Sequence, residues 1–155
     1  MRVVDLDRDM GDVIPTGTTR DSEHLFERMT QLTLERVAPA PGRRILDVAS
    51  GFGQDARALA ARGAWVAGAE PSRRMSGWAR LAQAKSPAAP VRFVRAWADA
   101  LPFRDRSFDA VMCKGALDHF DRPEQAIAEM ARVTARDGRV VLAIANFESL
   151  ACRLA

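Results

Sequence analysis

Apolar and polar positions along the chain follow two different periods. From 22 to 37 apolar residues recur every three or four positions, which predicts an amphipathic helix with Asp21 or Ser22 at its N-cap. After Pro39, Pro41 and Gly42 the period changes, and short apolar runs alternate with helical stretches. We predict strands over 45–48, 65–69, 91–95, 108–113 and 140–144, and helices over 55–61, 72–84 and 123–135.

Strands that alternate with helices of this length predict an α/β fold. We expect a Rossmann-like, doubly wound, mostly parallel sheet with helices on both faces. The 155 residues are enough for one core and too few for two. We therefore divide the chain into a polar segment over 1–20 and a single domain over 21–155, with an N-terminal helix over 21–38 and a core over 43–147.

Composition excludes several classes of protein. The net charge of +3 comes mostly from scattered arginines, with no basic run interleaved with aromatics, so we expect no nucleic-acid partner. Cys113 and Cys152 lie far apart and the chain has only 2 histidines, so we expect no metal site. No run approaches the ~18 apolar residues of a membrane span. The first ten residues are charged where a signal peptide would be apolar, so we expect a cytoplasmic protein.

A glycine loop follows the first predicted strand, in the stretch ILDVASGFGQDARALA. Gly51 and Gly53 let the backbone pass close beneath a ligand, although a glycine pair also fits a tight turn that only packs helix against strand. The loop can be read as a dinucleotide fingerprint ending at Ala56. Asp47 and Asp55 disfavour a diphosphate at that helix start. They favour a ligand with a cationic centre, such as S-adenosylmethionine.

The second predicted strand ends in Glu70, 23 positions after Asp47. An acidic residue about 20 positions after a glycine loop meets ribose hydroxyls in nucleoside-binding sheets. A carboxylate accepts hydrogen bonds from both hydroxyls at once. The glycine loop and Glu70 together therefore favour a nucleoside-containing ligand.

Four stretches carry a resemblance to a known family: ILDVASGFG, VAGAEPSRRM, WADALPFRDRSFDAVMCKGALDHF and EMARVTARDGRVVLAI. In order and spacing they resemble class I S-adenosylmethionine-dependent methyltransferases. The similarity is greatest to the small-molecule branch, methyltransferase type 11, which includes the ubiquinone and menaquinone methylases. It covers roughly residues 43 to 147. It implies S-adenosyl-L-methionine as cofactor, S-adenosyl-L-homocysteine as product and a small-molecule methyl acceptor.

The resemblance also implies which residues contact the cofactor. Asp47 and the backbone of Ala49, Ser50, Gly51 and Gly53 would hold its methionine end. Glu70 would bind the ribose. The adenine would lie between Pro71 and Met75, with Trp97, Ala98 and Asp99 at its edge. Cys113, Lys114 and Gly115 would close the site after the fourth strand.

Three departures from the family pattern stand out. Ala49 occupies a position where the family usually has glycine; its methyl group narrows the loop and excludes conformations with positive φ. Trp97 replaces an aspartate that contacts adenine, so either Asp99 takes over that contact or Trp97 stacks on the ring. Residues 136–138 replace Pro-Gly-Gly, and we expect Gly138 to supply a left-handed C-cap for the preceding helix.

Candidate catalytic residues follow the fourth strand. His119, oriented by Asp118, is placed to act as a base toward the acceptor, and the alternative is that it caps or packs the entry to the next helix. Lys114 either steers an anionic acceptor or lies solvated at the rim. His24 belongs to the N-terminal helix, which related enzymes use to cover the cofactor.

Three functions remain open: a small-molecule methyltransferase, a cofactor-binding module of the same fold that has lost catalysis, and an NAD-dependent enzyme disfavoured by Asp47 and Asp55. The family sheet continues past the fifth strand with a helix and two antiparallel strands, which we do not find in the sequence up to Ala155. We therefore expect an open sheet edge. Either the chain is a piece of a longer protein, or a second copy or another partner covers that edge.

Overall fold

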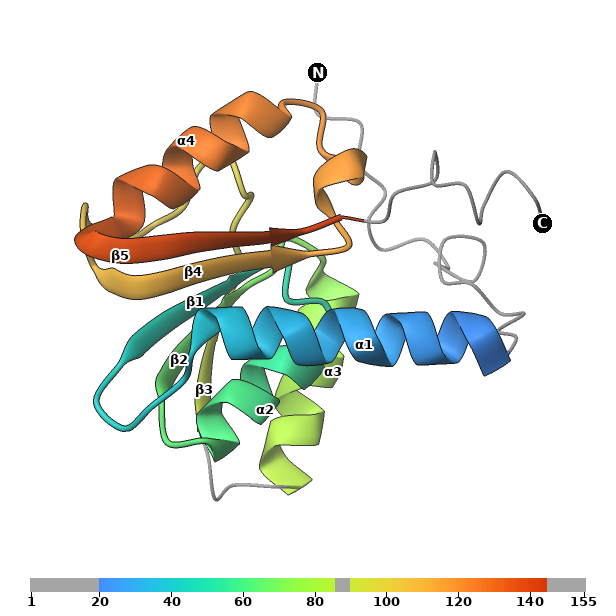
Figure 1. Ribbon diagram of the computed structural model, residues 1–155. Helices are drawn as coiled ribbons and strands as arrows, with labels where there is room; N and C mark the ends of the chain where they lie inside the picture. The colour runs from blue at the N-terminus through green and yellow to red at the C-terminus, as the bar shows by residue number, and fades with distance from the viewer. Residues whose placement is uncertain (1–19, 86–89, 145–155) are drawn as a thin grey trace.

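The structure is a computed structural model that describes residues 20–85 and 90–144 (Figure 1). In chain order the elements are α1 (Arg20–Val37), β1 (Arg44–Val48), α2 (Gln54–Ala61), β2 (Trp65–Ala69), α3 (Arg73–Lys85), β3 (Val91–Val94), β4 (Phe108–Lys114), the 3-10 helix η2 (Leu117–His119), α4 (Pro123–Val133) and β5 (Thr134–Ala143). The predicted polar segment over 1–20 lies almost wholly outside the described residues.

The five strands form one sheet in the order β3-β2-β1-β4-β5, and each neighbouring pair is parallel. The strand order reverses between β1 and β4, where ligands bind in doubly wound sheets. The predicted α/β class is confirmed. Within the described ranges we find no antiparallel pair.

Helices cover both faces of the sheet. Leu34 and Val37 of α1 and Ala56 and Leu59 of α2 pack with Ile45 on one face. Met130 and Val133 of α4 pack on the other face with Leu46, Val48 and Phe108. In Figure 1, α1, α2 and α3 lie below the sheet and α4 above it. The N-terminal half of α1 projects past the carboxyl ends of the strands.

Predicted and observed boundaries agree closely for the first strands and helices. Ser72 caps α3 as expected, because its hydroxyl accepts a hydrogen bond from the Met75 amide at 3.0 Å. The N-cap prediction for the first helix is wrong: α1 begins at Arg20, so Asp21 and Ser22 lie within its first turn.

The junction of α4 and β5 differs from the prediction. The helix ends at Val133, two residues early, and β5 begins at once with Thr134, whose hydroxyl donates to the Met130 carbonyl at 2.6 Å. The strand register jumps there, since Thr134 pairs with Phe108 whereas Arg139 already pairs with Ala110. The additional residues form a bulge, which the apolar pattern does not reveal.

The predicted left-handed cap at Gly138 is wrong. The cap of α4 is Thr134, in an extended conformation, and Gly138 has no positive φ. A Cβ at Gly138 would lie 2.7 Å from the Thr134 methyl group and 2.9 Å from the Asp109 carbonyl oxygen. Glycine is needed here because the bulge packs closely against β4.

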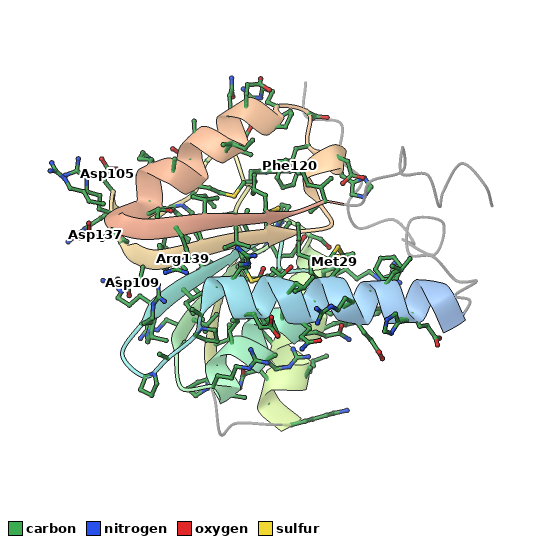
Figure 2. The ribbon with its side chains drawn as sticks, viewed as in Figure 1. Met29, Asp105, Asp109, Phe120, Asp137 and Arg139 are labelled. Carbon is green, nitrogen blue, oxygen red and sulfur yellow. The ribbon has the colours of Figure 1, made fainter. Side chains whose placement is uncertain are left out.

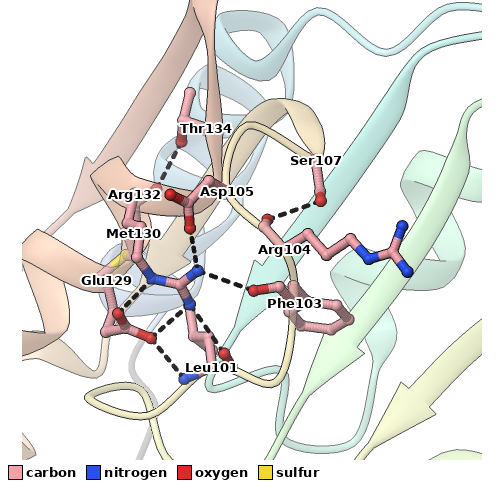
Figure 3. A network of polar contacts seen from close by, with 9 residues as sticks. All are labelled: Leu101, Phe103, Arg104, Asp105, Ser107, Glu129, Met130, Arg132 and Thr134. Carbon is pink, nitrogen blue, oxygen red and sulfur yellow. Dashed lines mark hydrogen bonds and ion pairs between the residues drawn. The ribbon is translucent and has the colours of Figure 1, made fainter.

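A polar network ties α4 to the loop before β4 (Figure 3). The Arg132 guanidinium donates to Glu129 at 2.6 and 2.8 Å, to Asp105 at 2.7 Å, and to the carbonyls of Phe103 and Leu101 at 2.9 and 3.0 Å. Glu129 in turn accepts from the Leu101 amide at 2.9 Å. One arginine thus satisfies both side-chain charges and backbone groups at the amino end of the sheet.

Within the described residues, β5 is an edge strand of the sheet. In the described sheet β5 pairs with β4 alone, and Leu142 and Ile144 are exposed. A hydrogen bond connects β5 to α1, because Arg139, labelled in Figure 2, donates to the Arg36 carbonyl at 3.2 Å. Of the helices in the described part of the chain, none has the length and apolar composition that a bilayer crossing needs.

Candidate functional site

Three charged side chains meet at the carboxyl ends of β1, β2 and β4. Asp47 pairs in register with Gly68 and Met112. Glu70 and Lys114 lie two positions beyond those partners. Because side chains alternate between faces along a strand, all three project toward the face that α1 and α2 cover.

The loop after β1 has a compact, left-handed backbone. Ala49, Gly51 and Gly53 have φ angles of 57°, 51° and 69°. The expectation that Ala49 excludes positive φ is therefore wrong: the alanine adopts the conformation that glycine would adopt. This conformation costs a non-glycine residue roughly 1–2 kcal/mol.

The glycines of the loop have different packing roles. A Cβ at Gly53 would overlap the Phe93 ring, so Gly53 permits close packing of the loop against β3. At Gly51 the nearest atom to an added Cβ would be the Met75 sulfur, 4.0 Å away. Gly51 therefore faces open space, as a cradle for a ligand requires. Next to it the Ser50 hydroxyl is buried without a hydrogen-bond partner.

The side chain of Phe52, between Gly51 and Gly53, packs against α3. Its ring stacks on Trp78 with centroids 5.3 Å apart and an interplanar angle of 18°. The Arg74 guanidinium lies 4.9 Å from the centre of the Trp78 ring. The Phe52 carbonyl also accepts a hydrogen bond from Arg57 at 2.8 Å. These contacts hold the strained loop in place.

Asp47 is enclosed, with only 3% of its surface exposed. Burial raises the pKa of this carboxyl well above its usual value, and the negative charges of Asp55 and Glu70 raise it further. Lys114 and a hydrogen bond from the Ala56 amide act in the opposite direction. A buried carboxyl with a raised pKa is typical of functional sites.

Glu70 connects the loop to α3. Its Oε2 accepts from the Gly51 amide at 3.0 Å and its Oε1 from the Ser72 amide at 2.9 Å. A carboxylate has about four acceptor positions, more than these two amide bonds use. Glu70 is thus fixed in orientation beside the open side of Gly51.

The Lys114 side chain is enclosed within the site rather than solvated at its rim. Its Nζ lies 2.7 Å from Asp55 Oδ2 and donates to the Thr30 hydroxyl at 2.6 Å. The ion pair joins β4 to the first turn of α2, and the hydrogen bond joins β4 to α1. Asp55, expected to attract a cationic ligand, is therefore already paired with a cation of the chain itself.

The remaining expected cofactor contacts are placed as follows. Pro71 and Met75 are half-buried beside the loop, and the Pro71 carbonyl accepts from Arg95 at 3.3 Å. Trp97 and Ala98 lie in the turn after β3, and the Asp99 carboxylate pairs with Arg122. Gly115 follows β4 with a φ of 63°.

Cys113 projects to the opposite face of the sheet from Lys114. Its side chain packs in the core with Leu46 and Val48. Burial raises the pKa of the thiol to about 12, and Asp47 and Asp118 contribute. The thiol is therefore a core group.

His119 and Asp118 stand on η2 at the rim of the site. Leu117 packs inward, whereas the His119 side chain is 58% exposed. Its Nε2 lies 3.8 Å from Asp118 Oδ2, which is longer than a hydrogen bond. The N-cap of α4 is Arg122, so His119 does not cap that helix. His24 is exposed on the N-terminal half of α1.

Sequence reasoning did not identify Thr30, Phe52, Trp78 or Arg122 as parts of the site. The face of Lys114 could have been read from its alternation with Met112, and the pairing with Asp55 from the adjacency of β1 and β4. The contact of Lys114 with Thr30 spans 84 positions and depends on where α1 packs.

The acceptor groups of the site suit a ligand that is an organic cation and carries hydroxyl groups. Asp47 and Glu70 supply two carboxyl groups at this end of the sheet, Glu70 lies beside the open Gly51, and the buried Ser50 hydroxyl next to Gly51 has no hydrogen-bond partner. Within residues 20–85 and 90–144 no cluster of three or more metal-binding side chains occurs. The residues present therefore fit the cofactor implied by the sequence.

Comparisons with known proteins agree with this geometry. A family model described as "Methyltransferase domain" matches residues 46–142. A demethylmenaquinone methyltransferase of Renibacterium salmoninarum is 36% identical over 132 residues, which are 85% of this chain and 51% of that protein. The chain spans about half the length of the curated relatives it matches.

Solved structures show the same fold. The YcgJ protein of Bacillus subtilis superposes with a TM-score of 0.71 at 30% identity, covering 75% of this chain and 50% of that one. An N-methyltransferase of Haemonchus contortus, in complex with phosphomonomethylethanolamine and S-adenosylhomocysteine, superposes with a TM-score of 0.70 at 26% identity. That match covers 76% of this chain and 28% of the other.

Proposed function

Because the chain belongs to the methyltransferase domain family, we propose that it binds S-adenosylmethionine at the carboxyl ends of β1 and β2 and transfers the methyl group to a small molecule. One observation carries the proposal: Glu70 is fixed beside the open Gly51, and it lies close enough to the buried Asp47 for their charges to interact. This arrangement offers anionic acceptors to an ammonium group and to ribose hydroxyls. A diphosphate would be repelled by the same carboxylates.

Each part of the site has a distinct role in this proposal. Asp47 and the backbone from Ala49 to Gly53 hold the methionine end, and Glu70 holds the ribose. When bound, the cofactor supplies a methyl group on a sulfonium, which needs no further activation. The chain's task is then to align the acceptor with that methyl group and to exclude water.

A base is needed only where the acceptor must lose a proton. His119 is the candidate, because it stands at the rim of the site and is open to solvent. A small side-chain rotation would bring Asp118 Oδ2, 3.8 Å from His119 Nε2, within hydrogen-bond distance of the ring. The acceptor to test first is a demethylated quinone, since a demethylmenaquinone methyltransferase is among the similar proteins.

The experiment is calorimetric titration of the chain with S-adenosylmethionine, S-adenosylhomocysteine and NAD in parallel. We expect heat of binding with both sulfur compounds and none with NAD. Binding of NAD alone would overturn the proposal in favour of a dinucleotide enzyme. Glu124→Gln, on the exposed first turn of α4, is a control that removes a carboxylate away from the site.

A second candidate function is a cofactor-binding module of the same fold without catalysis. It is favoured by the pairing of Asp99 with Arg122 and by the gap between His119 and Asp118. Formation of S-adenosylhomocysteine in the presence of candidate quinones separates the two functions. Binding without turnover, for every acceptor tried, would favour the module.

A further inference from the structure

Lys114 has an unusual position for a lysine in this chain. The sequence contains only two lysines, Lys85 and Lys114, and otherwise uses arginine as its cation. Lys85 ends α3 and is exposed, whereas the Lys114 side chain is only 20% exposed. The chain therefore places its one enclosed lysine among the carboxylates of the candidate site.

This lysine belongs to a cluster with three carboxyl groups that is centred on Asp47. Asp55 is its direct ion-pair partner at 2.7 Å, and Asp47 and Glu70 lie on the same face of the sheet. Asp47 is influenced by the charges of all three neighbours, Asp55, Glu70 and Lys114. The side chain of α1 that contacts Lys114 is the uncharged Thr30, and Cys113 of β4 is a neutral thiol. Lys114 is thus the cation within the described cluster.

The geometry gives the lysine two simultaneous tasks. Its ammonium has three donors, of which one is directed to Asp55 and one to Thr30. The first contact places a positive charge beside Asp55, which offsets part of the effect of the Asp55 charge on Asp47. The second fixes the lysine stem against α1, so that the ammonium stays at Asp55.

We propose that Lys114 is a positioning residue for the cofactor: by holding Asp55 in an ion pair it offsets part of the negative charge around Asp47, which helps Asp47 to meet the cationic end of S-adenosylmethionine as an anion. This role rests on the proposed function. Without Lys114, Asp47 faces Asp55 and Glu70 with no compensating cation, and it retains its proton to a higher pH. A protonated Asp47 offers no charge to an ammonium group.

The test is the pH dependence of S-adenosylmethionine affinity. The affinity is measured by calorimetry from about pH 5.5 to about pH 8.5, in steps of about half a pH unit. For Lys114→Met we expect the midpoint of the acidic limb to move up by about one pH unit. At the wild-type midpoint the affinity of the variant is then about fivefold lower, and well below both midpoints it is about tenfold lower. Lys114→Arg keeps the charge and is expected to restore most of the affinity and the wild-type midpoint.

Two further variants identify the path of the effect. Asp55→Asn removes the charge that pairs with Lys114, so it should move the midpoint of the affinity profile to lower pH. In the double variant with Lys114→Met, it should bring the midpoint back toward that of the wild type. This outcome decides the proposal even where Lys114→Met alone unfolds. Lys85→Met is the matched control, because it removes the same charge from the exposed end of α3.

The results distinguish this role from the proposed function. A wild type that binds the cofactor and a Lys114→Met variant with an unshifted profile overturn the role of Lys114 alone. A uniform loss of affinity at every pH, with no shift of midpoint, also overturns it, because it indicates a structural role. A wild type that binds no S-adenosylmethionine at any pH overturns both.

Discussion

Arg132 and Lys114 centre two polar networks at opposite ends of the same sheet. At the amino end, Arg132 meets two carboxylates and two carbonyls, and the pKa of Glu129 is lowered, chiefly by the hydrogen bond from Arg132. At the carboxyl end, Lys114 pairs with Asp55 and lowers the pKa of Asp47, yet the pKa of Asp47 is still raised. The first network stabilises its charged groups, whereas the second leaves one carboxyl in an unfavourable environment. Under the proposed function, the difference separates groups that stabilise the fold from groups that bind the cofactor.

The largest expected effect breaks the stabilising network. Arg132→Ala leaves the Leu101 and Phe103 carbonyls and Glu129 without their donor. We expect the free energy of unfolding to fall by about 2–4 kcal/mol in urea titration, with cofactor affinity unchanged. Arg136→Ala, an exposed arginine on the nearby bulge, should change stability little. Comparable losses in both variants would contradict the special role of Arg132.

The second prediction concerns Glu70, which belongs to the binding network but is well hydrogen-bonded. Glu70→Ala removes the acceptor of the Gly51 and Ser72 amides as well as the ribose acceptor. We expect cofactor binding to weaken by about 1–3 kcal/mol in calorimetry. Glu70→Gln should lose less, because it keeps one carbonyl oxygen. An unchanged affinity in Glu70→Ala would exclude the ribose assignment.

Asp47→Asn is expected to have opposite effects on stability and binding. In the folded chain the pKa of Asp47 is raised, so the folded state holds more protons than the unfolded state between the usual and the raised pKa. Asp47 therefore lowers stability as pH rises through that window. Asn keeps an acceptor for the Ala56 amide and removes the charge. We expect a gain of about 0.5–2 kcal/mol at neutral pH and weaker cofactor binding.

Thermal unfolding, measured from about pH 4 to about pH 8 in steps of about one pH unit, checks the direction of this effect on stability. The difference between Asp47→Asn and wild type should be small at low pH and grow as pH rises. A variant that is less stable than wild type at neutral pH would show that the Asp47 charge is well compensated. The two networks would then not differ as described.

The smallest expected effect lies in the backbone of the loop. Ala49→Gly relieves a left-handed alanine, and the greater freedom of glycine in the unfolded chain offsets part of that gain. We expect a net stabilisation of about 0.5–1 kcal/mol in urea titration. A destabilised variant would contradict the left-handed conformation of residue 49.

Much of the fold could be predicted because the apolar periods are clear. The strand 65–69 has the observed bounds, and the doubly wound class follows from the alternation of strands and helices. The junction after α4 could not be predicted, because the bulge before Arg139 depends on the close packing of Gly138 against Asp109. No local pattern encodes that contact.

The site divides in the same way. The sequence predicts Asp47 from its charge, Gly51 from the glycine loop and Glu70 from its spacing as cofactor contacts, and the structure places all three at the carboxyl ends of β1 and β2. The prediction for the Ala49 backbone is wrong because it rests on residue type alone. The stacking of Phe52 on Trp78 helps to hold residue 49 in its left-handed conformation. The partners of Lys114 come from α1 and α2, so they emerge only when the helices are packed.

The scarcity of lysine in this chain has a practical consequence for chemical labelling. Amine-directed acylation requires an accessible, uncharged amine, and the ion pair with Asp55 and the cover of α1 protect Lys114. Lys85, exposed at the end of α3, reacts in the same tube as an internal reference. The ratio of the two acylated peptides in mass spectrometry therefore reports how firmly α1 covers the cluster, without any need for a ligand or an assay.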